Sequence, residues 1–470
     1  MPTIQELTAL EILDSRGRPT VGATCRLGSG ASAWASVPSG ASTGRAEAVE
    51  LRDEDPSRYG GLGCRKAVGH IDSGLNDILR GREFATQRDL DEKLIALDGT
   101  PNKSRLGANA ILAVSIAFAR ACAIEGGVPL FQHFAHLLGS EPRALPRLTI
   151  NLFSGGLHAG GLFSLPRYSG GGQGRGFDQK AAHENPHLNP PPEYLEREKE
   201  VTPQSGYVPI QDVLIVPLTA PTIDESLATT YAIYHAAAAL CAKKYGMRPL
   251  VADEGGLAPP FASADAMLED AVEAVRAAGF APGSDVAIAV DIASSHFYRD
   301  GYYHLGTEPL TSLQMVDQIR RWSQRFPIIS VEDGLAEEDW QHWPALRNAI
   351  GGRALVMGDD LLCTNPQRIK RAIETSSANA LLLKVNQIGT LSEAADAYRL
   401  ARGAGWSITI SARSGETEDD WLADLATGWS ADFIKIGSIT RSERLAKYNR
   451  LLAIEAQTGM ALATRETGSA

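Results

Sequence analysis

The sequence predicts an α/β protein in which a mostly parallel β-barrel follows a smaller α+β domain. The chain has 470 residues, enough for one large barrel with an appended domain. From about Leu148 onward, short apolar runs alternate with longer helical stretches, which is the pattern of a parallel sheet built from β/α units. Several of these runs end in an acidic or basic residue, and active sites of parallel barrels lie at the carboxyl ends of the strands.

The first part of the chain, residues 1–140, mixes strand-like and helical segments. Pro19–Arg26 has the composition of a short strand, and Asn109–Gly126 is apolar almost throughout, as expected of a buried helix. This mixture predicts a separate α+β domain ahead of the barrel.

The remaining residues, 141–470, are predicted to form the barrel. Helical stretches such as Ser263–Ala278 and Leu313–Phe326 separate the predicted strands. Doubly wound open sheets show the same alternation, but the number of units favours closure into a barrel. The predicted strands are Asp212–Pro217, Ala287–Ile292, Pro327–Glu332, Ala354–Gly358, Ala380–Lys384, Ser407–Ser411 and Asp432–Ile436.

One segment, Gly160–Pro209, interrupts the alternation with a Gly-rich piece, a proline run and a charged stretch. Loops of this length are usually functional lids or linkers. The Gly-rich piece Ser169–Gly176 contains Arg175 and has the composition of a phosphate-binding loop. It lacks the GxxxxGK[ST] order of a P-loop, so a surface loop without a ligand stays an open alternative.

Composition excludes several classes of partner. The formal net charge of −11 argues against nucleic acid or an anionic membrane surface. The five cysteines are scattered and lack CxxC spacing, which argues against a disulfide framework or a zinc cluster and suits a reducing compartment. The start Met1–Leu10 lacks the pattern of a signal peptide, and no apolar run reaches membrane-spanning length. We therefore expect a cytoplasmic protein.

Carboxylates close three of the predicted strands. AIAVD ends at Asp291, IISVE at Glu332 and ALVMGDD at Asp359–Asp360. Acids on three neighbouring strand ends would repel one another unless a cation lies among them. Because hard oxygen ligands favour Mg²⁺ over zinc or copper, the sequence predicts a Mg²⁺ site at this end of the barrel.

Two further strands end in lysines, at Lys384 (LLLKVNQ) and Lys435 (DFIKIGS), and VADEGG places Glu254 on a turn. A lysine in such a place commonly pairs with an acid, but beside a metal its pKa can fall until it accepts a proton. A lysine base, an acid and Mg²⁺ are the groups needed to remove a proton α to a carboxylate.

Two segments are suited to binding a phosphate. Ser39–Gly44 (SGASTG) is a flexible stretch rich in hydroxyl and backbone N–H groups. Arg413–Ser414 supplies a planar guanidinium together with a hydroxyl.

Specific motifs are spread over nearly the whole chain: ILDSRGRPTV, PSGASTG, AVELRD, NKSRLGANAIL, SGGLHAGG, DEGG, VEDGLAEEDW, GDDLLCTN, LLLKVNQIGT, RSGETED and IKIGS with the following RSERLAKYNRLLAIE. These motifs resemble those of the enolase (phosphopyruvate hydratase) family. The resemblance implies an enolase-type TIM-like barrel with an N-terminal α+β cap, in which the first barrel elements depart from strict β/α alternation. It also implies a homodimer or a higher homo-oligomer.

The resemblance also implies roles for individual residues. Asp291, Glu332 and Asp359 would bind the first Mg²⁺, and Ser42 would join the substrate phosphate at a second. Lys384 would be the base at C2, Glu254 the acid at the C3 hydroxyl and Lys435 a ligand of the substrate carboxylate. The remaining implied site residues are Asp212 and His158 among the catalytic groups, and Arg413, Ser414, Ser39, Gly40 and Ala41 among the substrate-binding groups.

The sequence departs from the family pattern at several of these places. Ala412 stands where SHRSGET has its histidine, and Asp212 stands where IQEF has its glutamate. Arg18 and Gly22 depart from NPTVE. The segment Gly160–Pro209 is roughly 40 residues longer than its counterpart in the family.

These departures favour an enolase relative with an altered substrate. Space near the phosphate would suit a bulkier phosphorus group, as in the carboxyphosphonoenolpyruvate synthases of phosphonate and phosphinate biosynthesis. The substrate would then be a phosphorylated or phosphonylated carboxylic acid, with Arg167, Arg175 and Lys180 available for a cytidine-nucleotide-activated phosphonate. Two alternatives stay open: an ordinary enolase that dehydrates 2-phosphoglycerate to phosphoenolpyruvate, and a non-catalytic binding protein on the same scaffold.

Overall fold

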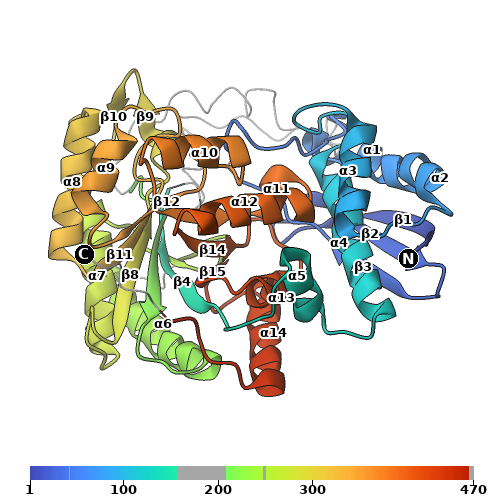
Figure 1. Cartoon of the computed structure of the whole chain (residues 1–470). Coiled ribbons are helices and arrows are strands. Elements are labelled where there is room, and N and C mark those ends of the chain that lie inside the picture. Colours follow the sequence, from blue (N-terminus) through green and yellow to red (C-terminus); the bar gives the residue numbers. More distant parts are fainter. Residues whose placement is uncertain (42, 157, 159–207, 247–249, 465–470) are drawn as a thin grey trace, which may run out of the picture.

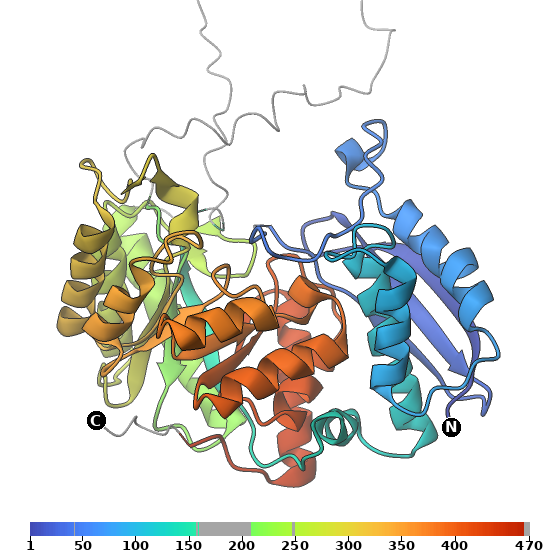
Figure 2. The same cartoon turned by 45° about the horizontal axis from the view of Figure 1, so that its top comes forward.

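The computed structural model describes residues 1–41, 43–156, 158, 208–246 and 250–464, and it contains a barrel with a smaller domain beside it (Figure 1). Segments of the predicted insert, including Arg167, Arg175 and Lys180, lie outside the described residues, as does Ser42. Figure 2 shows the smaller domain, in blue, alongside the barrel rather than beneath it.

The smaller domain is a three-stranded antiparallel sheet covered by helices. Its strands are β1 (Ile4–Leu13), β2 (Pro19–Leu27) and β3 (Ser32–Ser36), in that order. Its helices are α1 (Arg65–Gly69), α2 (Asn76–Leu79), α3 (Gln87–Asp98), α4 (Ala108–Glu125) and α5 (Leu130–Leu138). This sheet with its covering helices confirms the predicted α+β domain. One apolar helix, α4, buries one face of the sheet.

Helix α4 packs against β2 and β3. Among the described residues it is the one helix long and apolar enough to cross a membrane, but 78% of the segment is buried inside the protein. Its apolar sequence therefore serves the core of the small domain.

The barrel closes through eight strands, which confirms the prediction of closure. Their order is β15–β14–β13–β12–β11–β8–β5–β4, and β15 pairs with β4 to complete the ring. The strands are β4 (Arg147–Ser154), β5 (Asp212–Pro217), β8 (Val286–Asp291), β11 (Ile328–Glu332), β12 (Leu355–Gly358), β13 (Ala380–Leu383), β14 (Ser407–Ser411) and β15 (Phe433–Gly437). Each predicted barrel strand is present, with its ends shifted by one residue at most.

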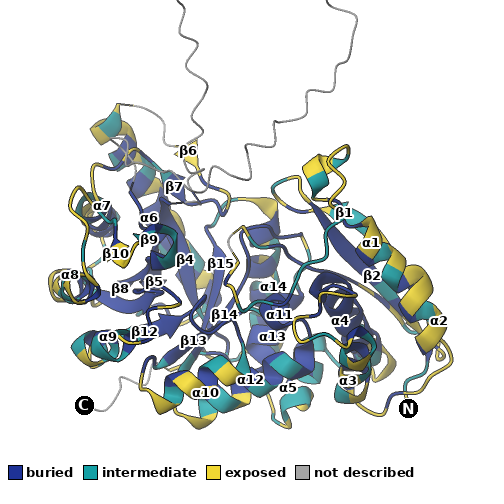
Figure 3. Ribbon diagram, turned by 90° about the horizontal axis from the view of Figure 1, so that it is seen from above, coloured by how far each residue is buried: buried dark blue, intermediate teal, exposed yellow. Residues whose placement is uncertain are grey.

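Helices cover the outside of this ring, and burial follows the same division (Figure 3). Barrel strands are almost entirely buried, whereas the helices expose their outer faces, except the helix Trp421–Gly428, which is buried throughout. The covering helices are α6 (Ile223–Tyr245), α7 (Ala264–Ala277), α8 (Ser312–Arg325), α9 (Trp343–Ile350), α10 (Pro366–Glu374), α12 (Leu391–Gly403), α13 (Trp421–Gly428) and α14 (Ser442–Thr458). Shorter elements at the strand ends are α11 (Val385–Ile388) and the two-residue strands β6 (Leu250–Val251), β7 (Leu257–Ala258), β9 (Tyr298–Arg299) and β10 (Tyr302–Tyr303).

Strand β5 runs antiparallel to both of its neighbours, β4 and β8. This is the departure from strict alternation that the resemblance implies. The backbone N–H of Gly155 donates to the carbonyl of Gln211 across 2.8 Å. The residue that follows β4 therefore lies beside the residue that precedes β5. A side chain at Gly155 would lie 2.5 Å from the Ile210 carbonyl, which explains the glycine. The start of β5, Asp212, consequently lies at the same end as the carboxyl ends of the parallel strands.

Candidate active site

Acidic residues at the ends of β8 and β11 face the lysine of β15. Asp291 and Glu332 are direct neighbours in the parallel register. The ammonium group of Lys435 donates to Asp291 Oδ2 across 2.8 Å and to Glu332 Oε1 and Oε2 across 2.9 and 2.8 Å. All three side chains are buried, so the strand ends hold a compact set of charges rather than a solvated surface.

The next acid, Asp359, follows β12 and is held by two groups from the region after β13. The Lys384 ammonium pairs with Asp359 Oδ2, and the side-chain amide of Gln387 donates to Asp359 Oδ1 across 2.7 Å. The three predicted metal ligands therefore lie on consecutive strand ends, and each faces a lysine.

Burial and like charge determine the pKa values of these groups. Burial and the neighbouring Asp291 and Asp359 raise the pKa of Glu332 well above its usual value. Burial also opposes ionisation of Asp291, but the Lys435 ammonium outweighs it and lowers the pKa of Asp291 to about 2. Burial would lower the pKa of Lys384, but the charges of Asp359 and Glu332 oppose it and the pKa is raised.

A raised pKa is the reverse of what a proton-accepting lysine needs. A divalent cation among the carboxylates would reverse it, because the cation would take the place of the ammonium group as their partner. The excess of buried carboxylates over lysines and the all-oxygen donor set both fit Mg²⁺. The residues that would hold the ion are Asp291, Glu332 and Asp359.

Two sets of acidic or imidazole side chains in the described residues are close enough to share one ion, and the predicted trio is neither of them. They are Asp333–Asp359–Asp360 and His158–Asp212–Glu254. The physical reason is the pairing with lysines, which draws Asp291 and Glu332 to Lys435 and Asp359 to Lys384. Asp333 already accepts from the backbone N–H groups of Asp359 and Asp360, across 2.9 and 2.7 Å, so it shapes the end of β12.

On another side of the barrel mouth, an imidazole lies between two carboxylates. His158 Nδ1 is 2.7 Å from Asp212 Oδ2, and its Nε2 is 3.6 Å from Glu254 Oε1. Burial opposes protonation of this ring, but Asp212 and Glu254 outweigh it and raise the pKa of His158 to about 9. Burial would raise the pKa of Glu254, yet His158 and Arg444 lower it. The neighbouring carboxylates therefore favour the protonated form of His158, against the burial that also raises the pKa of Asp212.

Asp212 is completely enclosed. The Ser154 hydroxyl donates to its Oδ1 across 2.6 Å, while its Oδ2 holds His158. Glu254 is fixed in turn by the Asn151 side-chain amide at 3.0 Å. The structure thus brings the three predicted catalytic residues of this side together, with Asp212 behind His158.

The phosphate-binding candidates meet where the small domain touches the barrel. The Arg413 guanidinium donates to both oxygens of Glu47, and the backbone N–H of Ala41 donates to the Ser414 hydroxyl across 2.9 Å. The backbones of Ser39 and Gly415 pair in an isolated antiparallel β-bridge. The loop that carries the predicted ligands of the small domain is therefore joined to the Arg413–Ser414 pair.

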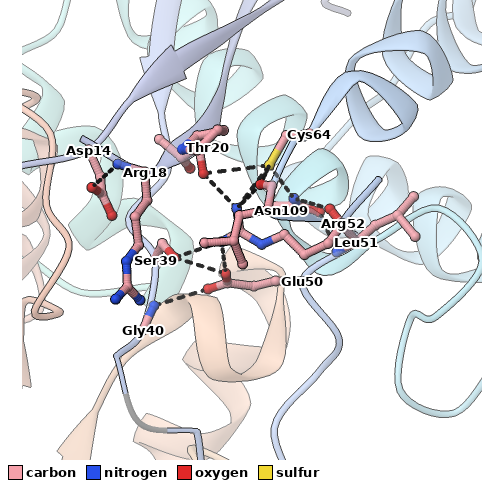
Figure 4. Close-up of polar contacts among 12 residues, drawn as sticks. Asp14, Arg18, Thr20, Ser39, Gly40, Glu50, Leu51, Arg52, Cys64 and Asn109 are labelled. Atoms are coloured by element: carbon pink, nitrogen blue, oxygen red, sulfur yellow. Dashed lines mark hydrogen bonds and ion pairs between the residues drawn. The ribbon is translucent and has the colours of Figure 1, made fainter. Parts of the chain in front are cut away.

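The base of this loop is held by an ion pair within the small domain (Figure 4). Arg52 donates to Glu50 and to the Ser39 hydroxyl, across 2.6 and 2.8 Å, and Glu50 accepts from the backbone N–H of Gly40 at 3.2 Å. These bonds fix Ser39 and Gly40 beside the barrel. Ala412, which directly follows β14, is buried, and its N–H donates to the Lys435 carbonyl across 2.8 Å.

Comparison with protein families agrees with this architecture. A model of the enolase N-terminal domain matches residues 4–134, and a model of the enolase C-terminal TIM barrel domain matches residues 203–466. The chain belongs to the enolase family. The part that neither model matches, residues 135–202, contains β4, His158 and most of the predicted insert.

Sequence reasoning missed several polar residues of this enolase-family site. Glu47, Gln387 and Ser154 contact the predicted residues directly. Gln387 lies inside the LLLKVNQIGT motif, so the sequence offered a signal for it. Glu47 precedes the AVELRD motif by one residue, and its partner Arg413 lies far away in the chain, which left no local signal.

Proposed function

We propose that this enolase-family enzyme depends on Mg²⁺ and removes the α-proton of a phosphoglycerate- or phosphoenolpyruvate-type acid. The observation that carries the proposal is the arrangement of Lys384, Lys435 and the His158–Glu254 pair around Asp291 and Glu332. One side supplies a lysine at the carbon to be deprotonated, and the other supplies a protonated imidazole near a departing hydroxyl.

Each group has a separable task. Lys384 takes the proton, Lys435 orients the substrate carboxylate, and Arg413 with Ser414 binds the phosphorus group. When bound, Mg²⁺ supplies positive charge that offsets the charge of the substrate as the proton leaves. Because the site residues are buried, water is largely excluded and these charges act strongly on one another.

The substrate is proposed to carry a phosphorus group bulkier than phosphate, as in a carboxyphosphonoenolpyruvate synthase. Two changes support this. Ala412 removes a ring from the β14 side, next to Arg413. Asp212 is too enclosed to touch a substrate, since both its oxygens are bonded to Ser154 and His158. The site keeps its proton-abstracting side and changes the side that assists loss of water.

A second candidate is ordinary dehydration of 2-phosphoglycerate. The observation that favours it is that Lys384, Glu254 and His158 are all retained. The charges of His158 and Lys384 lower the pKa of Glu254, and Glu254 in turn raises the pKa of His158. Glu254 and His158 together still provide an acidic proton beside the place of the C3 hydroxyl.

Purified protein with Mg²⁺ and 2-phosphoglycerate separates these functions. Formation of phosphoenolpyruvate at a rate typical of a glycolytic enzyme would establish the second candidate and refute the altered substrate. Exchange of the C2 proton with deuterated solvent, without loss of water, is the result we expect. Absence of both reactions, with a Lys384→Ala variant behaving identically, would indicate a non-catalytic binding protein.

A further inference from the structure

The loop of the small domain is joined to the barrel by the carboxylate of Glu47. Glu47 accepts from Arg413 Nη1 across 2.9 Å and from Nη2 across 3.2 Å. Both side chains are buried, with exposed fractions of 4% for Arg413 and 6% for Glu47. Glu47 also accepts from the backbone N–H of Gly44, at 3.0 Å, and so closes the loop on itself. A buried bidentate pair of this kind fixes both partners.

The same carboxylate lies next to the side-chain amide of Gln387, which is completely buried. Gln387 Nε2 is 2.7 Å from Asp359 Oδ1 and 3.4 Å from Glu47 Oε1. The Thr364 hydroxyl donates to Gln387 Oε1 across 2.8 Å, which determines the end of the amide that faces the carboxylates. The carbonyl of Gln387 also accepts from the backbone N–H of Ala48 at 2.8 Å.

These contacts form one continuous chain of polar groups. It runs from Lys384 to Asp359, through Gln387 to Glu47, and ends at Arg413. Its members come from the small domain and from the strand ends of the barrel. A carboxylate that holds a cation and a guanidinium that holds a phosphate both need a fixed orientation, and partners behind them supply it.

We propose that Glu47 and Gln387 are positioning residues that connect the phosphate-binding Arg413 with the cation-binding Asp359. The proposal rests on the proposed function, because it assigns phosphate to Arg413 and the cation to Asp359. Glu47 pairs with Arg413 and so anchors the loop. Gln387 holds Oδ1 of Asp359, and Oδ2 of Asp359 faces Lys384. The contacts of Glu47 and Gln387 thereby link the binding of phosphate at Arg413 to the binding of the cation at Asp359.

The Glu47→Gln variant tests the loop end of this chain. Loss of the bidentate carboxylate that orients Arg413 should weaken the binding of inorganic phosphate by about tenfold, measured by calorimetry. The loop should also loosen. Cleavage by trypsin after Arg45, whose side chain is 77% exposed, should therefore become faster in the variant than in the wild type. Unchanged or tighter phosphate binding, or unchanged cleavage at Arg45, would overturn the role of Glu47.

The Gln387→Met variant tests the other end, since methionine keeps the length of the side chain and removes the amide. Binding of Mn²⁺, followed by electron paramagnetic resonance, should weaken by about 10- to 100-fold, as for other partners behind metal ligands. Mn²⁺ affinity equal to that of the wild type would overturn the role of Gln387. Circular dichroism on each variant establishes that the fold is retained.

The chain offers a matched control in Asp424, a buried carboxylate that pairs with both Arg450 Nε and Nη2, across 2.7 and 2.6 Å, between α13 and α14. Asp424→Asn should leave phosphate binding, Mn²⁺ binding and cleavage at Arg45 unchanged. If the wild type binds neither phosphate nor Mn²⁺, the proposed function and this inference both fail. If it binds both and the two variants behave like Asp424→Asn, only the inference fails.

Discussion

His158 donates a hydrogen bond from Nδ1 to Oδ2 of Asp212 across 2.7 Å, deep inside the barrel mouth. The shorter acid at position 212 lets its carboxylate lie between Ser154 and this ring, with no part of it exposed. The pair therefore determines the charge on this side of the site, next to Glu254. An imidazolium at neutral pH is the direct consequence, because the pKa of His158 is raised to about 9.

The first prediction follows from that pair. Asp212→Asn keeps an acceptor for Nδ1 but removes the charge, so the pKa of His158, measured by NMR, should fall below about 9. Because the pKa of His158 is higher in the folded state than in the unfolded chain, its protonation contributes stability that is fully present below about pH 6.5. This contribution is lost as the pH rises through about 9, because the folded-state pKa is the higher one. Urea unfolding at several pH values should show a smaller decline over this range in the variant. Identical pH dependence in both proteins would contradict the assignment.

A second prediction concerns the loop that presents Arg413 and Ser414. Arg444 of α14 is fully buried and donates to the carbonyls of Arg413, Ile436 and Ser414 across 2.6, 2.9 and 2.6 Å. Arg444→Lys cannot satisfy all three carbonyls, so it should lower the free energy of unfolding by about 2 kcal/mol. Inorganic phosphate should also bind more weakly. Arg450→Lys on the same helix serves as the control, because Arg450 pairs with Asp424 instead.

The strand ends of this enolase-family barrel were accessible to sequence reasoning, because several of the apolar runs end at a charged residue. That placed Asp291, Glu332, Lys384 and Lys435 at one end of the barrel without knowledge of the fold. Pairings between distant segments could not be derived in this way. Glu47 and Arg413 are 366 residues apart, and nothing local to either residue indicates the other.

A third prediction concerns the cation. Burial and the neighbouring carboxylates raise the pKa of Glu332 well above its usual value, and a cation bound among these carboxylates would lower it. Calorimetry in buffers of different ionisation enthalpy should therefore show proton release on binding. Mg²⁺ at about 100 times its dissociation constant should stabilise the fold by about 2.7 kcal/mol, and a chelator should remove this effect. Asp291→Asn should abolish both responses, and NaCl at equal ionic strength should reproduce neither.

The last prediction explains one departure from the family pattern, Gly22. A Cβ added at this position would lie 1.9 Å from Cζ2 of Trp34, whose indole covers the glycine on the neighbouring strand. Gly22→Ala should therefore destabilise the small domain by about 1–3 kcal/mol, measured by urea unfolding. Trp34→Ala removes the obstacle, so Gly22→Ala in that background should cost much less. The coupling between the two sites in a double-mutant cycle tests this directly. An equal cost of Gly22→Ala in both backgrounds would show that the strand conformation, rather than the indole, requires the glycine.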